Sequence, residues 1–147
     1  MYLILISLLI LIDQVTKINI KSFLNSEGSY EVINKIFYLT YVENRGAAFG
    51  MFQNSKAIFI IAALGVTLVG IYYLYRVDLN KITKISICMI IAGAIGNMID
   101  RVRLGYVIDF FDFRFIWSYV FNFADILVVV GTIVLCIELL FGGSDKK

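Results

Sequence analysis

The sequence predicts an all-α polytopic membrane protein with four transmembrane helices and a small β-sheet, and three observations lead to this fold class. Hydrophobic residues make up 61% of the 147 positions and charged residues only 16%, whereas a soluble domain carries about a quarter charged residues. The mean hydropathy is +0.88. The apolar residues gather in four segments, each near the roughly 20 residues that a transmembrane helix needs. At this length we expect one compact domain over residues 1–147.

The first two predicted spans differ in their charge. We place the first at residues 2–23, where Asp13 and Lys17 interrupt an otherwise apolar segment. On a helix these two side chains lie on one face, four residues apart, and can form a stabilising ion pair. The second span, residues 57–75, carries no charged residue and is the clearest membrane segment.

The other two predicted spans each hold an aspartate. The third, residues 82–100, ends at Asp100, and its uncharged stretch is short, so Asp100 should lie near a membrane surface. The fourth, residues 116–141, holds Asp125 in its first half and ends before Gly142. Both aspartates are therefore expected near the same surface.

The polar region between the first two spans, residues 24–56, predicts the sheet. Residues 36–42 are β-branched and aromatic, which is typical of a strand. Four spans put both termini on one side, so this region lies on the other side, with the loop at 102–115. The side of the termini has five basic residues and the opposite side seven. The positive-inside rule therefore leaves the orientation open.

The composition excludes several kinds of chemistry. The chain has no histidine, which removes Ser-His-Asp and Cys-His catalysis and the common histidine metal sites. Its 13 basic and 11 acidic residues give a net charge of +2, which is too balanced to indicate a nucleic-acid partner. We expect no metal and no cofactor. Carboxylates remain, and at membrane depth they are costly unless they are paired or protonated.

Asp125 is the first candidate for acid chemistry because it lies inside an apolar span. Two carboxylates that share a site cannot both ionise readily, so one keeps a proton, and the pair can activate water and protonate a leaving amine. Asp109 lies among apolar and aromatic residues, where desolvation would raise its pKa. Asp100 has Arg101 beside it and Arg103 three residues later, so it should stay ionised in a structural ion pair. This favours Asp109 as the partner of Asp125, while Asp100 stays a candidate.

Polar side chains also share a face of the third span. The spacing of three and four residues puts Asn97, Asp100 and Arg101 together on one face of a helix. Either an interhelical polar clamp or direct catalysis would explain these three side chains. Gly93 and Gly96 follow the same turn pattern and allow a close approach of a neighbouring backbone.

Two more polar residues flank the candidate carboxylates. Asn122 precedes Asp125 by three positions, as Asn97 precedes Asp100. Asp112 follows Asp109 by three positions, and we predict that it is a solvated acid of the loop.

Five motifs make the chain resemble the lipoprotein signal peptidases (signal peptidase II). They are DQVTK at 13–17, NRGAAFG at 44–50, GAIGNMIDR at 93–101, VIDF at 107–110 and FNFAD at 121–125. Five motifs in the right order are far more specific than any one alone. One departure is Ala92, where many members carry a further glycine; because alanine is also small, the packing should be preserved.

The resemblance implies a membrane aspartyl peptidase in the bacterial inner membrane, with both termini in the cytoplasm and the sheet and site near the extracytoplasmic surface. It implies a prolipoprotein substrate whose cysteine carries diacylglycerol, with cleavage just before that cysteine. It also implies contact with membrane lipid and binding of globomycin-type inhibitors, and we expect a monomer. The implied catalytic pair is Asp109 and Asp125. The other implied site residues are, for substrate binding, Asn44, Asn97, Arg101 and Asn122, and, as supports, Asp13, Lys17, Asp100 and Gly46.

Two other functions stay open on the residues alone. A small proton- or ion-coupled transporter also uses intramembrane acids, as relays, although here the acids gather toward one surface and the second span is uncharged. A structural membrane subunit would tolerate the joint replacement of Asp109 and Asp125.

Overall fold

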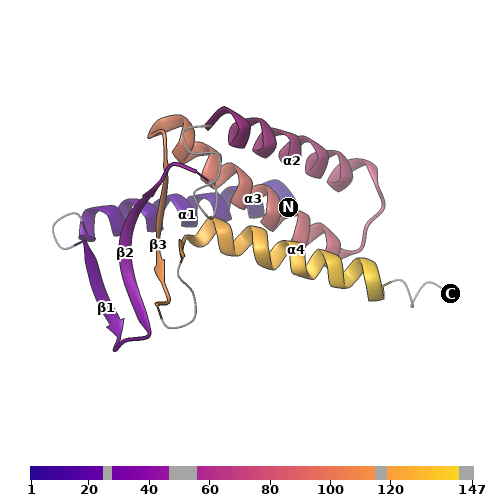
Figure 1. Ribbon diagram of the computed structural model, residues 1–147. Coiled ribbons are helices and arrows are strands. Elements are labelled where there is room, and N and C mark those ends of the chain that lie inside the picture. Colours follow the sequence, from indigo (N-terminus) through magenta and orange to yellow (C-terminus); the bar gives the residue numbers. More distant parts are fainter. Residues whose placement is uncertain (25–27, 47–55, 115–118, 143–147) are drawn as a thin grey trace.

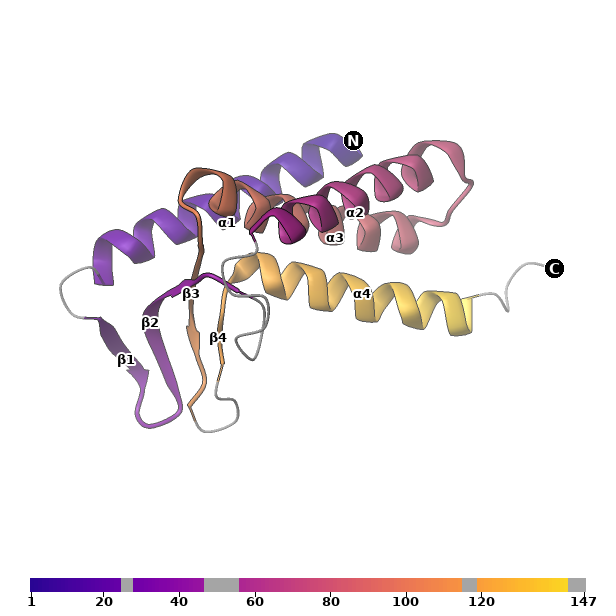
Figure 2. The ribbon, with the colours of Figure 1, turned by 45° about the horizontal axis from the view of Figure 1, so that its top comes forward.

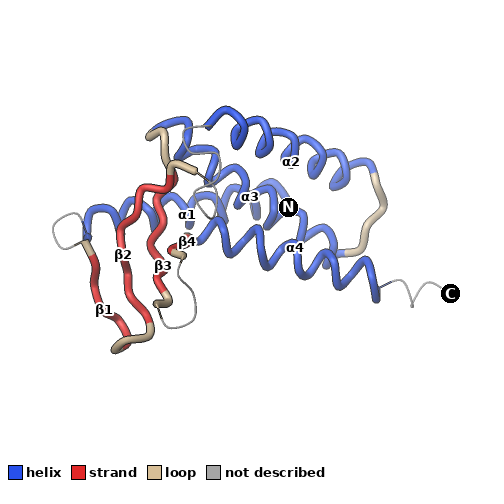
Figure 3. Tube along the Cα trace, viewed as in Figure 1, coloured by secondary structure: helices blue, strands red, loops and turns tan. Residues whose placement is uncertain are grey.

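The computed structural model describes residues 1–24, 28–46, 56–114 and 119–142. The strands gather at one end of the helical bundle (Figures 1 and 3). In chain order the elements are α1 (Tyr2–Leu24), β1 (Ser29–Ile33), β2 (Phe37–Asn44), α2 (Lys56–Arg76), α3 (Lys81–Arg103), β3 (Val107–Asp112), β4 (Val120–Phe121) and α4 (Phe123–Phe141).

Among the described residues, four helices are long and apolar enough to cross a membrane, and this confirms the predicted fold class. The helix α3 contacts each of the other three. Large apolar side chains such as Leu68, Ile133 and Leu139 are exposed on the outside of the bundle, whereas Asp13 and Lys17 are buried inside it. This distribution suits a lipid environment, because a soluble protein rarely exposes so large an apolar surface. The apolar core is formed by Ile6, Leu74, Ile87, Cys88, Ile91, Ala92 and Leu127.

Two helices begin at asparagine caps. The side chain of Asn80 accepts a hydrogen bond of 2.8 Å from the backbone N–H of Thr83 and starts α3. Asn122 caps α4 in the same way. The fourth span therefore begins at Phe123, and our prediction of a start at residue 116 was wrong. The residues just before the cap, Val120–Phe121, instead pair with β3 as strand β4.

The sheet is antiparallel throughout, with the strand order β1-β2-β3-β4. The strand predicted at 36–42 is confirmed as β2. Our assignment of residues 102–115 to a loop was wrong for Val107–Asp112, which form β3 because they pair with β2. In this register Val42 lies opposite Asp109 and Asn44 opposite Val107.

The sheet lies at the end of the bundle away from the beginning of α1 and the end of α4. Figure 2 shows these two chain ends and the connection between α2 and α3 on the other side from the strands. The sheet packs against the bundle through contacts of β2 and β3 with α1, and of β3 with α3. The end of α3 and the beginning of α4, which carry Asp100 and Asp125, therefore face the sheet.

Glycines let the helices approach closely at this end. A Cβ atom on Gly96 would lie 2.5 Å from Asp13 Oδ2, and a Cβ atom on Gly93 would overlap the backbone oxygen of Ala124. The predicted close approach at these two glycines is confirmed. It brings α1, α3 and α4 together at the end of the bundle that faces the sheet.

Candidate active site

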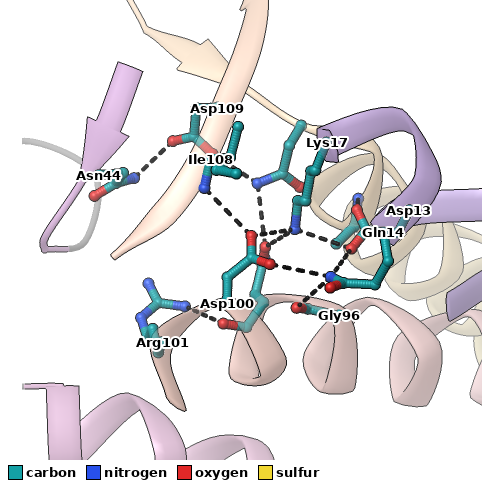
Figure 4. A network of polar contacts seen from close by, with 12 residues as sticks. Asp13, Gln14, Lys17, Asn44, Gly96, Asp100, Arg101, Ile108 and Asp109 are labelled. Carbon is teal, nitrogen blue, oxygen red and sulfur yellow. Dashed lines mark hydrogen bonds and ion pairs between the residues drawn. The ribbon is translucent and has the colours of Figure 1, made fainter. Parts of the chain in front are cut away.

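The candidate site forms where the sheet meets the bundle, from side chains that five elements supply. Strand β3 supplies Asp109, and Asn44 at the end of β2 reaches it across the antiparallel pair. Helix α3 supplies Asn97, and the first turn of α4 supplies Asp125. Helix α1 supplies Lys17. Figure 4 shows the part of this network around Lys17, with Asn44 and Asp109 at its upper left.

Asp109 is only 1% exposed and accepts hydrogen bonds at both carboxylate oxygens. Asn122 Nδ2 donates to Oδ1 at 2.6 Å and Asn44 Nδ2 donates to Oδ2 at 2.8 Å. Burial raises the pKa of Asp109 to about 7, and the charge of Asp125 adds to this effect. The raised pKa that we predicted from its apolar surroundings is confirmed, and it makes Asp109 a group that holds a proton close to neutral pH.

Asp125 is half-buried and is held by a capping box. Its Oδ2 accepts the backbone N–H of Asn122 at 3.1 Å, and Asn122 Oδ1 accepts the backbone N–H of Asp125 at 2.9 Å. Asn97 Nδ2 donates to Asp125 Oδ1 at 2.8 Å. The carboxylate is therefore fixed by donors on two helices.

Asn122 connects the two carboxylates. It is fully buried, and its amide donates to Asp109 while its carbonyl caps the helix turn that carries Asp125. The charge of Asp125 acts on the pKa of Asp109, as expected for acids that share a site. One buried acid that keeps its proton and one more exposed carboxylate can together activate a water molecule and protonate a leaving group.

A buried ion triad of Lys17, Asp13 and Asp100 lies next to these acids, between α1 and α3. Lys17 Nζ lies 2.9 Å from Asp13 Oδ2 and 3.0 Å from Asp100 Oδ2, and all three side chains are at most 3% exposed. The predicted Asp13–Lys17 ion pair is confirmed. Asp13 Oδ1 also accepts the backbone N–H of Ala124 at 3.0 Å, which ties α1 to the first turn of α4.

Asp100 is ionically paired as predicted, but not with the arginines that we expected. Its partner is Lys17 of α1 (Figure 4). Arg101 instead donates to the carbonyl oxygens of Gly46, at 3.3 Å, and Asn97, at 3.4 Å. Arg103 donates to Gln14 Oε1 at 3.4 Å. The reason is geometric: Lys17 approaches Asp100 from a neighbouring helix, whereas Arg101 and Arg103 point elsewhere.

Gly46 receives contacts from both sides of the site. Its N–H donates to Asn44 Oδ1 at 3.0 Å, which orients the Asn44 amide so that Nδ2 meets Asp109. Its carbonyl accepts from Arg101, whose guanidinium also stacks 4.4 Å from the centroid of Phe59. The rest of the motif, residues 47–50, lies outside the described residues.

Asp112 is not the solvated loop acid that we predicted. It lies on β3 and is 8% exposed. It accepts a hydrogen bond of 2.7 Å from Thr40 Oγ1 and forms an ion pair of 2.9 Å with Arg114. Pairing of β2 with β3 brings Thr40 to it, so Asp112 stabilises the sheet at a distance from Asp109 along the strand.

Two site residues escaped the sequence analysis. Gln14 Nε2 donates to Asp13 Oδ2 and Asp100 Oδ1, at 3.1 Å each, and to the carbonyl of Gly96 at 3.3 Å. Its position beside Asp13 in the first motif was an available signal. Phe59 lies in the first turn of α2, in an uncharged segment, and no local pattern marks it as the ring against which Arg101 packs.

Comparison with known proteins gives a consistent result. The family model described as Signal peptidase (SPase) II matches residues 5–141. A lipoprotein signal peptidase of Clostridioides difficile is 54% identical over 147 residues, which cover 100% of this chain and 99% of that protein. One from Caldanaerobacter subterraneus is 47% identical and covers 99% of this chain and 100% of that protein.

Solved structures agree with the fold. A bacterial membrane enzyme solved at 2.3 Å resolution matches with a TM-score of 0.89 at 32% identity, covering 99% of this chain and 91% of that one. A second, solved at 1.9 Å, matches with a TM-score of 0.81 at 31% identity, covering 95% of this chain and 92% of that one.

Proposed function

The chain belongs to the signal peptidase II family, and from this premise we propose that it is an aspartic endopeptidase whose catalytic pair is Asp109 and Asp125. As a member of this family it is a multi-pass membrane peptidase that removes signal peptides from prolipoproteins. The observation that carries the aspartic mechanism is the position of Asn122. Its side-chain amide donates to a buried acid with a pKa of about 7, and its backbone N–H donates to the half-buried carboxylate of Asp125. The finer substrate that we propose is a prolipoprotein with a diacylglyceryl cysteine, cleaved just before that cysteine.

In the proposed mechanism Asp125 is the general base and Asp109 the general acid. The Asp125 carboxylate takes a proton from water as the water oxygen attacks the scissile carbonyl carbon, and Asp109 gives its proton to the carbonyl oxygen. Asp125 then gives its proton to the amide nitrogen as the C–N bond breaks, and Asp109 regains a proton from the tetrahedral hydroxyl. Protons balance, and the pair returns to its starting state.

We propose that Asn44, Asn97, Arg101 and Asn122 line the substrate site. The contacts of Asn44, Asn97 and Asn122 with the carboxylates favour a shared role, in which these amides also fix the acids. Arg101 contacts Gly46, which follows β2, and Phe59 of α2, so its guanidinium lies where the sheet meets the bundle. We propose that four further residues hold these side chains in place: Gly46, Asp13, Lys17 and Asp100.

For the membrane arrangement we propose that both termini lie in the cytoplasm and that the sheet lies near the outer surface of the bacterial inner membrane. The separation of the sheet from both chain ends supports this (Figure 2). The diacylglyceryl chains would remain in the bilayer beside the helices while the scissile bond reaches the polar end of the bundle. The transporter alternative is not retained, because the buried acids gather at this end and the family is a peptidase family.

The test uses the purified full chain in detergent micelles and a gel-shift assay. A diacylglyceryl-modified prolipoprotein and the same prolipoprotein without lipid serve as matched substrates. We expect cleavage of the modified substrate just before its cysteine, inhibition by a globomycin-type lipopeptide, and little cleavage of the unmodified one. Folded protein that cleaves neither substrate would contradict the proposed function, and equal cleavage of both would contradict the proposed lipid requirement.

A further inference from the structure

Lys17 is a buried cation that does more than balance acids. Its side chain is 1% exposed, and its ammonium lies near three acceptors: Asp13 Oδ2, Asp100 Oδ2 and Asn97 Oδ1, the last at 3.0 Å. An ammonium group carries donors and no acceptor. Any amide that meets it must therefore turn its oxygen toward it, and this requirement applies to Asn97.

The orientation of the Asn97 amide follows from this contact. Its Oδ1 accepts from Lys17 and from Asn122 Nδ2, the latter at 3.1 Å, so its Nδ2 is left to donate to Asp125 Oδ1. An asparagine amide turned by 180° keeps nearly the same shape, and only its hydrogen-bond partners distinguish the two states. With the amide reversed, Asn97 Oδ1 would face a carboxylate oxygen, and its N–H groups would face the Lys17 ammonium.

The orientation of the Asn97 amide also bears on that of Asn122. Because Asn97 Oδ1 is an acceptor, Asn122 presents its Nδ2 to it, and this Nδ2 also donates to Asp109 Oδ1. Asn122 Oδ1 then points to the backbone N–H of Asp125. Each proposed catalytic carboxylate thus receives an N–H group from one of two amides. Lys17 orients Asn97 directly, and Asn122 is oriented both by Asn97 and by the backbone N–H of Asp125.

We propose that Lys17 is a positioning residue for the reaction: its ammonium fixes the direction of the Asn97 amide. That amide then donates to Asp125 and accepts from Asn122, which donates to Asp109. The inference rests on the proposed function for the catalytic identity of the two aspartates. The proposed role differs from support of the fold. A purely structural Lys17 would act only through its ion pairs with Asp13 and Asp100, whereas the proposed role acts through its contact with Asn97.

The kinetic test compares Lys17→Gln with Lys21→Gln. Glutamine is neutral but can still donate to Asp13 and Asp100, so it removes the ammonium while keeping N–H donors. Because two buried carboxylates then lose their counter-charge, thermal melting in micelles checks that the variant is folded. Lys21 lies one turn later on α1 and donates to Tyr106 Oη, outside the network. For Lys17→Gln we expect kcat to fall at least about tenfold and KM to change less than about twofold, because Lys17 does not touch substrate. Lys21→Gln should match wild type.

A double-mutant cycle separates the relay from a general structural effect. If Lys17 acts through Asn97, adding Lys17→Gln to Asn97→Ala should lower kcat no further. Multiplied losses of kcat in the double variant, or a rise of KM at constant kcat in Lys17→Gln, would overturn the proposal.

A second readout is independent of cleavage. In wild type, NMR should show a nuclear Overhauser effect between the Asn97 side-chain amide protons and the Asp125 β protons, and Lys17→Gln should weaken it while Lys21→Gln keeps it. If Lys17→Gln fails to fold, the variant Lys17→Gln with Asp100→Asn removes one buried charge of each sign and is read in the same way. An unchanged signal would overturn the positioning role. A weakened signal in a protein that cleaves no prolipoprotein would support that role and contradict the proposed function instead.

Discussion

Asn122 and Asp125 cap each other at the start of α4. Asn122 Oδ1 accepts the Asp125 backbone N–H at 2.9 Å, and Asp125 Oδ2 accepts the Asn122 backbone N–H at 3.1 Å. The helix start and the proposed general base are therefore one structural unit. Because the capping box occupies one oxygen of Asp125, the other stays directed at Asn97 Nδ2, 2.8 Å away.

Replacement of Asp125 by Asn should abolish most of the cleavage without unfolding the protein. Asparagine has the same size but cannot accept a proton from water, so we expect the rate to fall by about 10²–10⁴. Gel-shift rates and thermal melting in micelles measure the two effects. The matched control is Glu138→Gln, at the other end of α4, where Glu138 meets Asn80; it should cleave like wild type. Wild-type turnover by folded Asp125→Asn protein would refute the proposed pair.

The cleavage rate should fall as the pH rises above about 7. Burial and the charge of Asp125 raise the pKa of Asp109 to about 7, so below this pH Asp109 keeps the proton that it gives to the scissile carbonyl. Above it the rate should fall about tenfold per pH unit. Initial rates between pH 5 and 9 (roughly two units either side of the pKa) measure this fall in the cleavage rate. A rate that stays constant up to the upper end of that range would contradict Asp109 as the acid.

The same pKa predicts a pH dependence of stability. The ordinary pKa of this group is 3.8, so between pH 3.8 and about 7 the folded protein binds a proton that the unfolded chain has lost. The contribution of Asp109 to the free energy of unfolding is therefore fully present below pH 3.8. It declines by up to about 4 kcal/mol as the pH rises to about 7. Unfolding of wild type and Asp109→Asn in micelles across this range should show a stability difference that changes with pH. A constant difference would contradict the raised pKa.

Local patterns were enough to predict most of the fold. The apolar segments and the β-branched stretch at 36–42 depend on nearby residues, and the structure has helices and a strand there. Strand β3 was missed because VIDFFD is short and mixes apolar and acidic residues, and it becomes a strand through its pairing with β2. The start of α4 was placed too early because Val120–Phe121 are apolar enough for a membrane helix; the cap at Asn122 was the signal that counted.

The candidate site was predictable in its residue types but not in its connections. Desolvation pointed to Asp109, and an acid inside an apolar span pointed to Asp125. Helix spacing compares residues within one helix, so it paired Asp100 with Arg101 and Arg103. The observed partner, Lys17, is distant in sequence and comes from α1. Only the packing of α1 on α3 brings these charges together.

Loss of the buried Asp13 carboxylate should destabilise the whole bundle. Asp13→Ala would leave Lys17 with one fewer counter-charge and the backbone N–H of Ala124 without its acceptor. Removing one member of a buried ion pair costs about 3–5 kcal/mol. Denaturant unfolding in micelles measures the change, with Asp78→Ala as the control because Asp78 is exposed; that variant should stay within about 0.5 kcal/mol of wild type. Equal effects would show that the triad contributes little.

Two glycines in membrane helices should respond in opposite ways to replacement by alanine. A Cβ atom on Gly93 would overlap the backbone oxygen of Ala124 and lie 2.7 Å from Val128 Cγ2, so α3 and α4 would have to separate. We expect a loss of about 1–3 kcal/mol. Cleavage should fall as well, because these two helices carry Asn97 and Asp125. At Gly65, no atom of the described residues lies within 4 Å of the added Cβ.

Gly65→Ala should therefore keep wild-type cleavage and gain up to about 1 kcal/mol from the better helix propensity of alanine. Unfolding in micelles and gel-shift rates, measured on both variants side by side, test the pair. If Gly93→Ala were as stable and as active as Gly65→Ala, the close contact of α3 with α4 could not be what holds Asn97 against Asp125. The capping box of α4 would then have to position that carboxylate without help from α3.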